Sequence, residues 1–277
     1  CFTLRYIKKY CAHFLYASIL FPDLTSIPLF ILKSLTDCFM VNTRAWLAEA
    51  IATFALVFFG PLSVILAVVV FGDGTLSTEA IIMISLGHGG AIALMVYAFG
   101  HVSGAHINPA VTIPMMITKR IGVKDGIGYI LFQIIGAVIA TATLAVLFPE
   151  IGKQVLWGAH GGPSDILGGS VISAVVLEII FTFFLVTVIF MTAVHKKAPK
   201  SVYGAAIGGM VFLLHLIGVP LTGASMNPAR SFSPALISGD AGLWEVQWIY
   251  WIGPIIGGII AGVLMTYIYV NKSEKEE

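Results

Sequence analysis

Six long apolar segments constrain this chain more than any other feature of its sequence. A helix needs about 20 predominantly apolar residues to cross the hydrocarbon core of a bilayer. The composition agrees, because 58% of the residues are hydrophobic and only 10% are charged, whereas soluble domains carry about 25% charged residues. We therefore predict an all-α, multi-pass membrane protein surrounded by the lipid bilayer. The predicted spans are 46–71, 80–99, 126–148, 168–194, 202–220 and 244–270.

Charge and cysteine content exclude several other classes. The formal net charge is +1, and no long basic run offers a surface for nucleic acid. All three cysteines, Cys1, Cys11 and Cys38, precede the first predicted span. A disulfide framework or a cysteine-based metal site in the membrane region is therefore not expected.

The first 39 residues differ from the rest of the chain. Pro22, Pro28 and several charged residues divide them into apolar pieces that are too short to span a membrane. We expect residues 1–39 to be an N-terminal extension that the working protein does not need, and the fold to begin at Met40. The predicted channel domain is 40–270, followed by a cytoplasmic tail, 271–277.

Two shorter apolar segments, 108–118 and 227–237, each begin with Asn-Pro-Ala. They have about half the length of a span, which predicts re-entrant half-helices. The chain also repeats itself: 48–57 resembles 177–186, and 103–110 resembles 222–229. The halves, 45–148 and 168–270, contain an odd number of spans each, so we predict that they are inverted relative to one another.

Basic residues predict the orientation in the membrane. They occur at the two ends and in two connections, between the second and third spans and between the fourth and fifth. By the positive-inside rule, both termini are predicted to be cytoplasmic. These residues are Arg44, Lys119, Arg120, Lys124, Lys196, Lys197, Lys200, Lys272 and Lys275.

The two Asn-Pro-Ala motifs predict the chemistry. Pro109 and Pro228 suit the first helical position, and Asn108 and Asn227 are natural N-caps. One such motif could be an ordinary capped helix start, but two at matching repeat positions favour a function. Opposed half-helices bring two positive dipole ends together and repel cations. The asparagine amides can donate to a neutral oxygen acceptor. Ala110 and Ala229 complete the motifs.

Arg230 directly follows the second motif. An intramembrane arginine costs about 2.5 to 3.5 kcal/mol even on a lenient scale. A snorkelling or ion-paired arginine is one interpretation, but its position favours the cationic wall of a selectivity filter.

Segments 100–112 and 225–231 together resemble the paired motifs of the aquaporin, or major intrinsic protein, family. The resemblance covers about residues 45–270. It implies six spans with two half-helices, a pore in every subunit and a homotetramer. We expect the protein in the cell membrane, and we expect no cofactor. The resemblance also implies that a line of backbone carbonyls accepts hydrogen bonds in the pore. Those carbonyls belong to Gly104, Ala105, His106, Ile107, Gly223, Ala224, Ser225 and Met226.

Family spacing also implies the partners of Arg230 in the filter. They lie twenty residues before Asn108, and twelve and three residues before the second asparagine, which selects His88, His215 and Ala224. His215 is similar to the residue of water-selective members, whereas His88 resembles plant vacuolar aquaporins. Neither histidine has metal-ligand neighbours in the sequence, so no metal site is expected. Whether loop residue His160 reaches the pore mouth stays open at this point.

Glu49 and Glu178 are apolar-span carboxylates at equivalent repeat positions. A proton relay is one interpretation, but the family resemblance implies that they support the backbone before each half-helix. We predict a passive water channel that excludes protons and ions. Ammonia, hydrogen peroxide or glycerol as further permeants, and an ion-coupled transporter, are the alternatives. An enzyme is not expected, because no nucleophile and base accompany these residues.

Overall fold

The computed structural model describes residues 29–271. The chain divides into two compact units, 1–45 and 46–277. Residues 1–28 of the predicted extension, 1–39, lie outside the described residues. The helix α2 (Leu29–Val64) begins before Met40, where the sequence predicted the fold to start.

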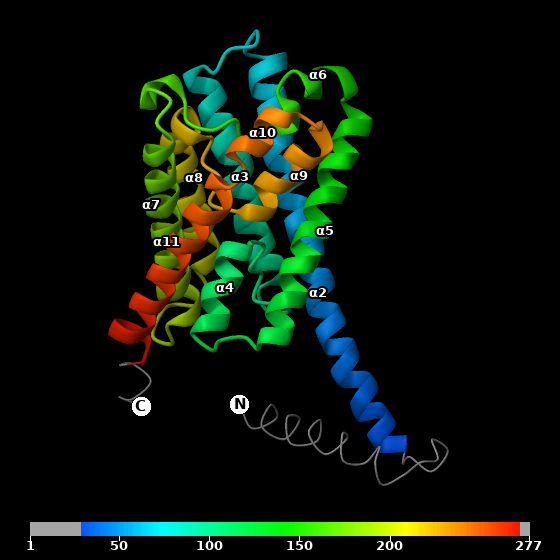
Figure 1. Ribbon diagram of the computed structural model, residues 1–277. Helices are drawn as coiled ribbons and strands as arrows, with labels where there is room; N and C mark the ends of the chain where they lie inside the picture. The colour runs from blue at the N-terminus through cyan, green and yellow to red at the C-terminus, as the bar shows by residue number, and fades with distance from the viewer. Residues whose placement is uncertain (1–28, 272–277) are drawn as a thin grey trace. The chain divides into compact units, whose positions relative to one another are not determined.

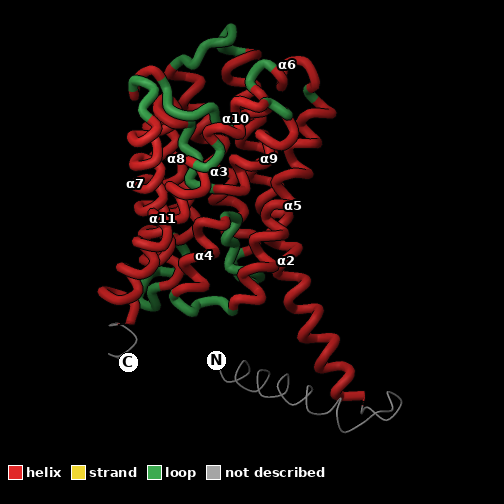
Figure 2. Tube along the Cα trace, viewed as in Figure 1, coloured by secondary structure: helices red, strands yellow, loops and turns green. Residues whose placement is uncertain are grey.

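The second unit is a helical bundle, and Figure 2 shows only helices and loops among the described residues. Within residues 29–271, six helical stretches are long and apolar enough to cross a membrane, which confirms the predicted number. Five are α2 from Thr43 onward with η2 (Ile65–Val70), α3 (Thr78–Phe99), α5 (Val123–Leu147), α7 (Val171–Ile189) with η5 (Phe190–Val194), and α8 (Tyr203–Thr222). The sixth combines α10 (Ala241–Val246), α11 (Ile249–Met265) and η6 (Thr266–Val270).

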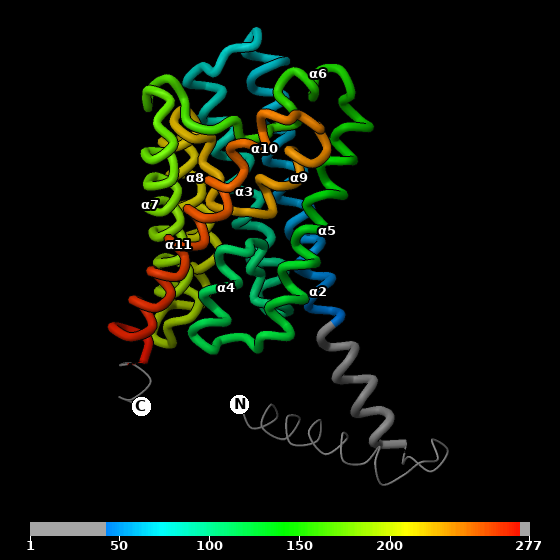
Figure 3. Tube along the Cα trace, in the orientation of Figure 1, coloured from blue at the N-terminus to red at the C-terminus, as the bar shows by residue number. Residues whose placement is uncertain are grey.

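Two short helices occupy the middle of this bundle: α4 (Pro109–Ile117) and α9 (Pro228–Ser238). In Figure 1, α4 lies in the lower half and α9 in the upper half, and the two are in contact. Irregular backbone leads into each of them, as Figure 3 shows. The connection between the two repeats contains α6 (Pro149–Lys153), η3 (Leu156–Gly158) and η4 (Asp165–Leu167).

Glycines at equivalent repeat positions allow the spans to pack closely. A Cβ on Gly136 would lie 2.1 Å from the carbonyl oxygen of Ala50, and one on Gly257 would lie 2.2 Å from that of Ile179. Small residues at helix crossings are the usual means of close packing in membranes, where apolar burial gives little driving force. The matched pairs join α5 to α2 and α11 to α7, as an internal repeat requires.

Both half-helices begin as the sequence predicted. Asn108 Oδ1 accepts a hydrogen bond from the Ala110 N–H at 2.8 Å. Asn227 Oδ1 accepts from the N–H groups of Ala229 at 3.1 Å and Arg230 at 3.3 Å. The proline after each asparagine occupies the first helical position, where its missing N–H costs nothing.

Candidate functional site: a polar constriction between two cavities

The two half-helices meet end to end through their asparagines. Asn108 Nδ2 donates to the carbonyl of Met226 at 2.7 Å, and Asn227 Nδ2 donates to the carbonyl of Ile107 at 3.0 Å. Each amide oxygen caps its own helix, so the orientation of both amides is assigned by their partners. Because an amide nitrogen carries two hydrogens, each side chain keeps one donor for the space beside it.

Glu49 holds the backbone that leads into α4. Its carboxylate accepts four hydrogen bonds, from Ser103 Oγ at 2.6 Å, His106 N at 2.9 Å, Ile107 N at 2.7 Å and Gln133 Nε2 at 2.8 Å. An acceptor-only carboxylate matches this set of donors. The arrangement supports bracing of the loop, the interpretation favoured for this residue.

Glu178 does the same for the loop before α9 with three donors. It accepts from Thr222 Oγ1 at 2.7 Å, Ser225 N at 3.0 Å and Met226 N at 2.8 Å. The fourth donor of the first repeat, Gln133, has no counterpart among these contacts.

Both loops need this support because their backbones alternate through left-handed conformations. The φ angles are 89°, 47° and 60° at Gly104, Ala105 and Ile107. They are 86°, 56° and 51° at the equivalent Gly223, Ala224 and Met226. Such conformations cost about 1 to 3 kcal/mol for residues with a Cβ, so the surroundings must hold them. The matching angles show that the two loops are built alike.

Two tyrosines complete the support, and the sequence did not predict this role for them. Tyr129 donates to the carbonyl of Ser103 at 2.7 Å, and Tyr250 donates to the carbonyl of Thr222 at 2.8 Å. Polar side chains within apolar spans, Gln133 among them, were the available signal, since such residues usually have a partner.

Arg230 is buried, with 3% of its surface exposed, and lies against His88. Its Nη1 donates to the carbonyl of Gly158 at 2.6 Å, and its Nε and Nη2 lie 3.3 and 3.1 Å from His88 Nε2. His88 Nδ1 lies 2.8 Å from the carbonyl oxygen of Ile84, which can only accept. The proton of His88 is therefore assigned to Nδ1, which leaves Nε2 as the acceptor for Arg230.

His215 has the same tautomer as His88. Its Nδ1 lies 2.9 Å from the carbonyl oxygen of Val211, and its ring stacks on His88 with centroids 4.3 Å apart. Its Nε2 has no hydrogen-bond partner among the described residues. A buried acceptor of this kind is expected to bind water or a permeant, because leaving it unsatisfied is costly.

His160 also lies in this site, although it comes from the connection between the repeats. Its Nδ1 lies 2.9 Å from Ser231 Oγ, and its Nε2 has no partner among the described residues. Burial and the charge of Arg230 hold the pKa of His160 well below its usual value, so it is neutral. A Cβ on Gly223 would lie only 2.5 Å from the ring. The ring therefore occupies space that the glycine leaves open.

The predicted filter residues are not all placed alike. His88, His215 and Arg230 come together and line a common cavity. Ala224 is fully buried and is not among the residues that line the three cavities described below, whereas its neighbour Gly223 is. Among residues 43–271, no group of three histidine, cysteine or acidic side chains could hold a metal ion.

Three cavities lie in series through the bundle. The α4-side cavity has a volume of about 330 Å³, the central constriction about 30 Å³ and the α9-side cavity about 250 Å³. Ile92 and Asn108 line both the α4-side cavity and the constriction, and His88 and Arg230 line both the constriction and the α9-side cavity. The shared residues indicate one path, whose narrowest part holds about one water molecule.

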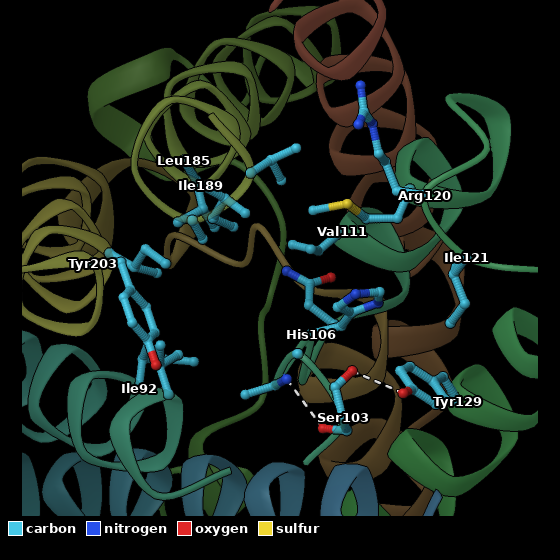
Figure 4. A pocket seen from close by; sticks show the side chains of 18 of the residues that line it. Ile92, Ser103, His106, Val111, Arg120, Ile121, Tyr129, Leu185, Ile189 and Tyr203 are labelled. Atoms are coloured by element: carbon cyan, nitrogen blue, oxygen red, sulfur yellow. Dashed lines mark hydrogen bonds between the residues drawn. The ribbon is translucent and has the colours of Figure 1, made fainter. Parts of the chain in front are cut away.

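Figure 4 shows the α4-side cavity, which polar and apolar side chains line, from close by. His106 and Tyr129 lie near one another, while Leu185 and Ile189 line the opposite side. Leu56 and Leu185 line the constriction together with the asparagines. Both parts of the path are therefore lined by polar and apolar side chains together.

The fold and this path define a multi-pass membrane channel. The sequence profile of the family named Major intrinsic protein matches residues 38–265, so the chain belongs to that family. The Aquaporin-4 proteins of Bos taurus and Homo sapiens are 43% and 42% identical to it over 191 residues, which cover 68% of this chain and 56% of each relative. The chain thus spans about half the length of these relatives.

Two further comparisons cover more of both chains. Aquaporin TIP2-3 of Arabidopsis thaliana is 36% identical over 247 residues, which cover 88% of this chain and 95% of the relative. The X-ray structure of the aquaglyceroporin from Plasmodium falciparum superposes with a TM-score of 0.71 at 20% identity, covering 84% of this chain and 99% of that one. At this identity the second comparison supports the fold alone, six spans with two half-helices.

Proposed function

We propose that this protein is a passive channel that conducts water down osmotic gradients and excludes protons and ions. The observation that carries the proposal is the pair of bonds by which Asn108 and Asn227 each reach the opposite loop. This geometry brings two helix N-termini, each with about half a unit of positive charge, to one point on the path. Such half-helix dipoles are the accepted basis of cation and proton exclusion in aquaporins.

Water fits the constriction better than larger solutes. Asn108 and Asn227 can each donate one hydrogen bond to a water oxygen, which orients the molecule and interrupts a chain of water-to-water bonds. Arg230, 3% exposed, adds a fixed charge to the same path. A constriction of about 30 Å³ has no room for the carbon backbone of glycerol beside His88 and His215. Several relatives are named aquaporins, which agrees with this substrate.

Small neutral solutes are the second candidate class. The Nε2 atoms of His160 and His215 have no hydrogen-bond partner among the described residues. The Nε2 of His215 is an acceptor, which favours permeants that donate hydrogen bonds, such as ammonia or hydrogen peroxide. Glycerol is a weaker candidate on grounds of size. An ion-coupled transporter would need a site that changes its access between the two sides.

A stopped-flow assay tests the proposal. Purified protein in liposomes should increase osmotic water permeability strongly over empty liposomes, with glycerol permeability close to the empty control. Ammonia and hydrogen peroxide, measured in the same preparation, decide the second candidate class. Flux that saturates at ordinary solute concentration or depends on an ion gradient would instead indicate a transporter, and no water flux above empty liposomes would refute the channel.

We further propose a homotetramer in the cell membrane with both termini cytoplasmic. Large apolar side chains are exposed along the spans, such as Leu86 at 63% and Val146 at 80%, and lipid or neighbouring subunits would cover them. The basic connections lie on the α4 side, which the positive-inside rule assigns to the cytoplasm. We also propose that residues 1–39 are not needed for conduction. Scattering mass in detergent and protease protection in sealed vesicles test the assembly and the orientation.

A further inference from the structure

The direction of the Arg230 side chain depends on the connection between the repeats. One of its partners, His88, belongs to the long helix α3, whereas the other, Gly158, ends the short turn η3 in the loop that connects the repeats. The Gly158 carbonyl receives the shortest of the guanidinium's hydrogen bonds, at 2.6 Å. Hydrogen bonds to charged groups are stronger than neutral ones. A displacement of the loop would therefore release one edge of the guanidinium.

The backbone around Gly158 adopts an unfavourable left-handed conformation. Leu156, Trp157 and Gly158 are three consecutive residues with positive φ, at 47°, 49° and 76°. Only glycine adopts this region at little cost, because a Cβ collides with the backbone. Two of the three residues carry a Cβ, so the conformation persists only if other contacts hold it.

Trp157 supplies those contacts. It is 9% exposed and packs with Ile65 and Leu144 in a small apolar cluster. Its Nε1 donates to the carbonyl of Phe148 at 3.3 Å. Gly152 leaves room for the ring, since a Cβ there would lie 2.5 Å from Trp157 Cδ1 and Nε1. Trp157 is not among the residues that line the three cavities, so it touches no permeant.

We propose that Trp157 is a positioning residue for the selectivity filter: its buried ring holds the left-handed loop that presents the Gly158 carbonyl to Arg230. This inference rests on the proposed channel function. Without the ring, the loop relaxes, Arg230 loses its partner on that side, and the constriction admits larger neutral solutes.

The test compares glycerol and water permeability in liposomes for Trp157→Ala, Trp157→Phe and Phe190→Ala. Phe190 is a fully buried aromatic residue in η5 that packs beside Gly262, and it controls for general loosening of the fold. Trp157→Ala should raise the ratio of glycerol to water permeability roughly tenfold, the scale set by one hydrogen bond to a charged group. Trp157→Phe should recover most of the wild-type ratio, and Phe190→Ala should leave it unchanged.

A second comparison shows whether the effect passes through Arg230. In an Arg230→Val background, Trp157→Ala should change the ratio no further, because coupled residues are non-additive. If Trp157→Ala does not fold, Gly152→Ala provides the same test, because its methyl group displaces the ring. A wild-type ratio in the folded variants, or an equal increase with and without Arg230, would overturn the inference. Absence of water flux in the wild type would instead refute the proposed function.

Discussion

Gly60→Ala is a small substitution that should disturb the filter from outside it. Gly60 is buried in α2, and a Cβ there would lie 2.5, 2.6 and 2.9 Å from Nε2, Cδ2 and Cε1 of His88. The ring cannot move away without losing its bond to the Ile84 carbonyl at 2.8 Å or its stacking on His215. In an unobstructed helix interior, alanine stabilises by up to about 1 kcal/mol relative to glycine. Overpacking of this kind costs about 1 to 3 kcal/mol, so we expect net destabilisation.

The functional consequence follows from which His88 atom the new methyl group would displace. His88 Nε2 is the acceptor for Arg230, so the displaced ring both weakens that contact and enters a constriction of about 30 Å³. We expect a several-fold fall in water permeability at equal amounts of reconstituted protein.

The matched control is Gly90→Ala, because a Cβ on this glycine of α3 meets no atom within 4 Å. It should keep wild-type flux and gain slightly in thermal stability. The double variant Gly60→Ala/His88→Ala should recover flux, since it removes the collision. Stopped-flow osmotic shrinkage and thermal unfolding in detergent measure both effects. Wild-type permeability and stability in Gly60→Ala would refute the placement of His88.

Three further predictions concern pH, the tyrosines and a buried acid. Burial lowers the pKa of His160 and of His106, and the charge of Arg230 lowers the pKa of His160 further. Water flux should therefore stay constant between about pH 8 and pH 6. A fall in flux centred near pH 6.5 would contradict this prediction. Because the unfolded chain takes up protons first, the thermal stability should decline only as the pH falls below about 6.5. Tyr250→Phe removes two hydrogen bonds and Tyr129→Phe one; at about 0.5 to 1.5 kcal/mol each, Tyr250→Phe should lower the unfolding temperature more. Glu49→Gln replaces a carboxylate oxygen by an NH2 group that faces the hydrogen-bond donors around it. This should lower the free energy of unfolding by at least about 3 kcal/mol, measured as a loss of folded protein. A normal yield of folded protein would contradict the bracing role.

Much of the fold could be predicted because it follows from chain length and local rules. Apolar segments of bilayer length have one solution in lipid, a helix, since every backbone polar group must be satisfied internally. Asparagine and proline in sequence encode a helix start that needs no tertiary contact. The sequence did not predict a helix over 29–39, where α2 begins, because those residues were judged only by whether they could span a membrane.

The site was only partly predictable, because its remaining members depend on how separate segments meet. His160 belongs to a connection without periodicity, and only the folded loop places it against Ser231. Gln133 appears in the sequence as one polar residue in an apolar span, and its bond to Glu49 joins positions far apart in the chain. The line of left-handed residues at 156–158 contains leucine and tryptophan, which carry no sequence signal for that conformation.

Simultaneous measurement of water, glycerol and proton flux in wild type, His88→Ala and Arg230→Val decides whether His88 and Arg230 form the selectivity filter of a water channel. The wild type should conduct water alone. His88→Ala should gain glycerol flux because it removes the ring that fills the constriction and holds Arg230. Arg230→Val should gain glycerol flux and also leak protons, because it removes the fixed charge that assists the dipoles of α4 and α9. Unchanged selectivity in both variants would contradict the account and remove these residues from the filter.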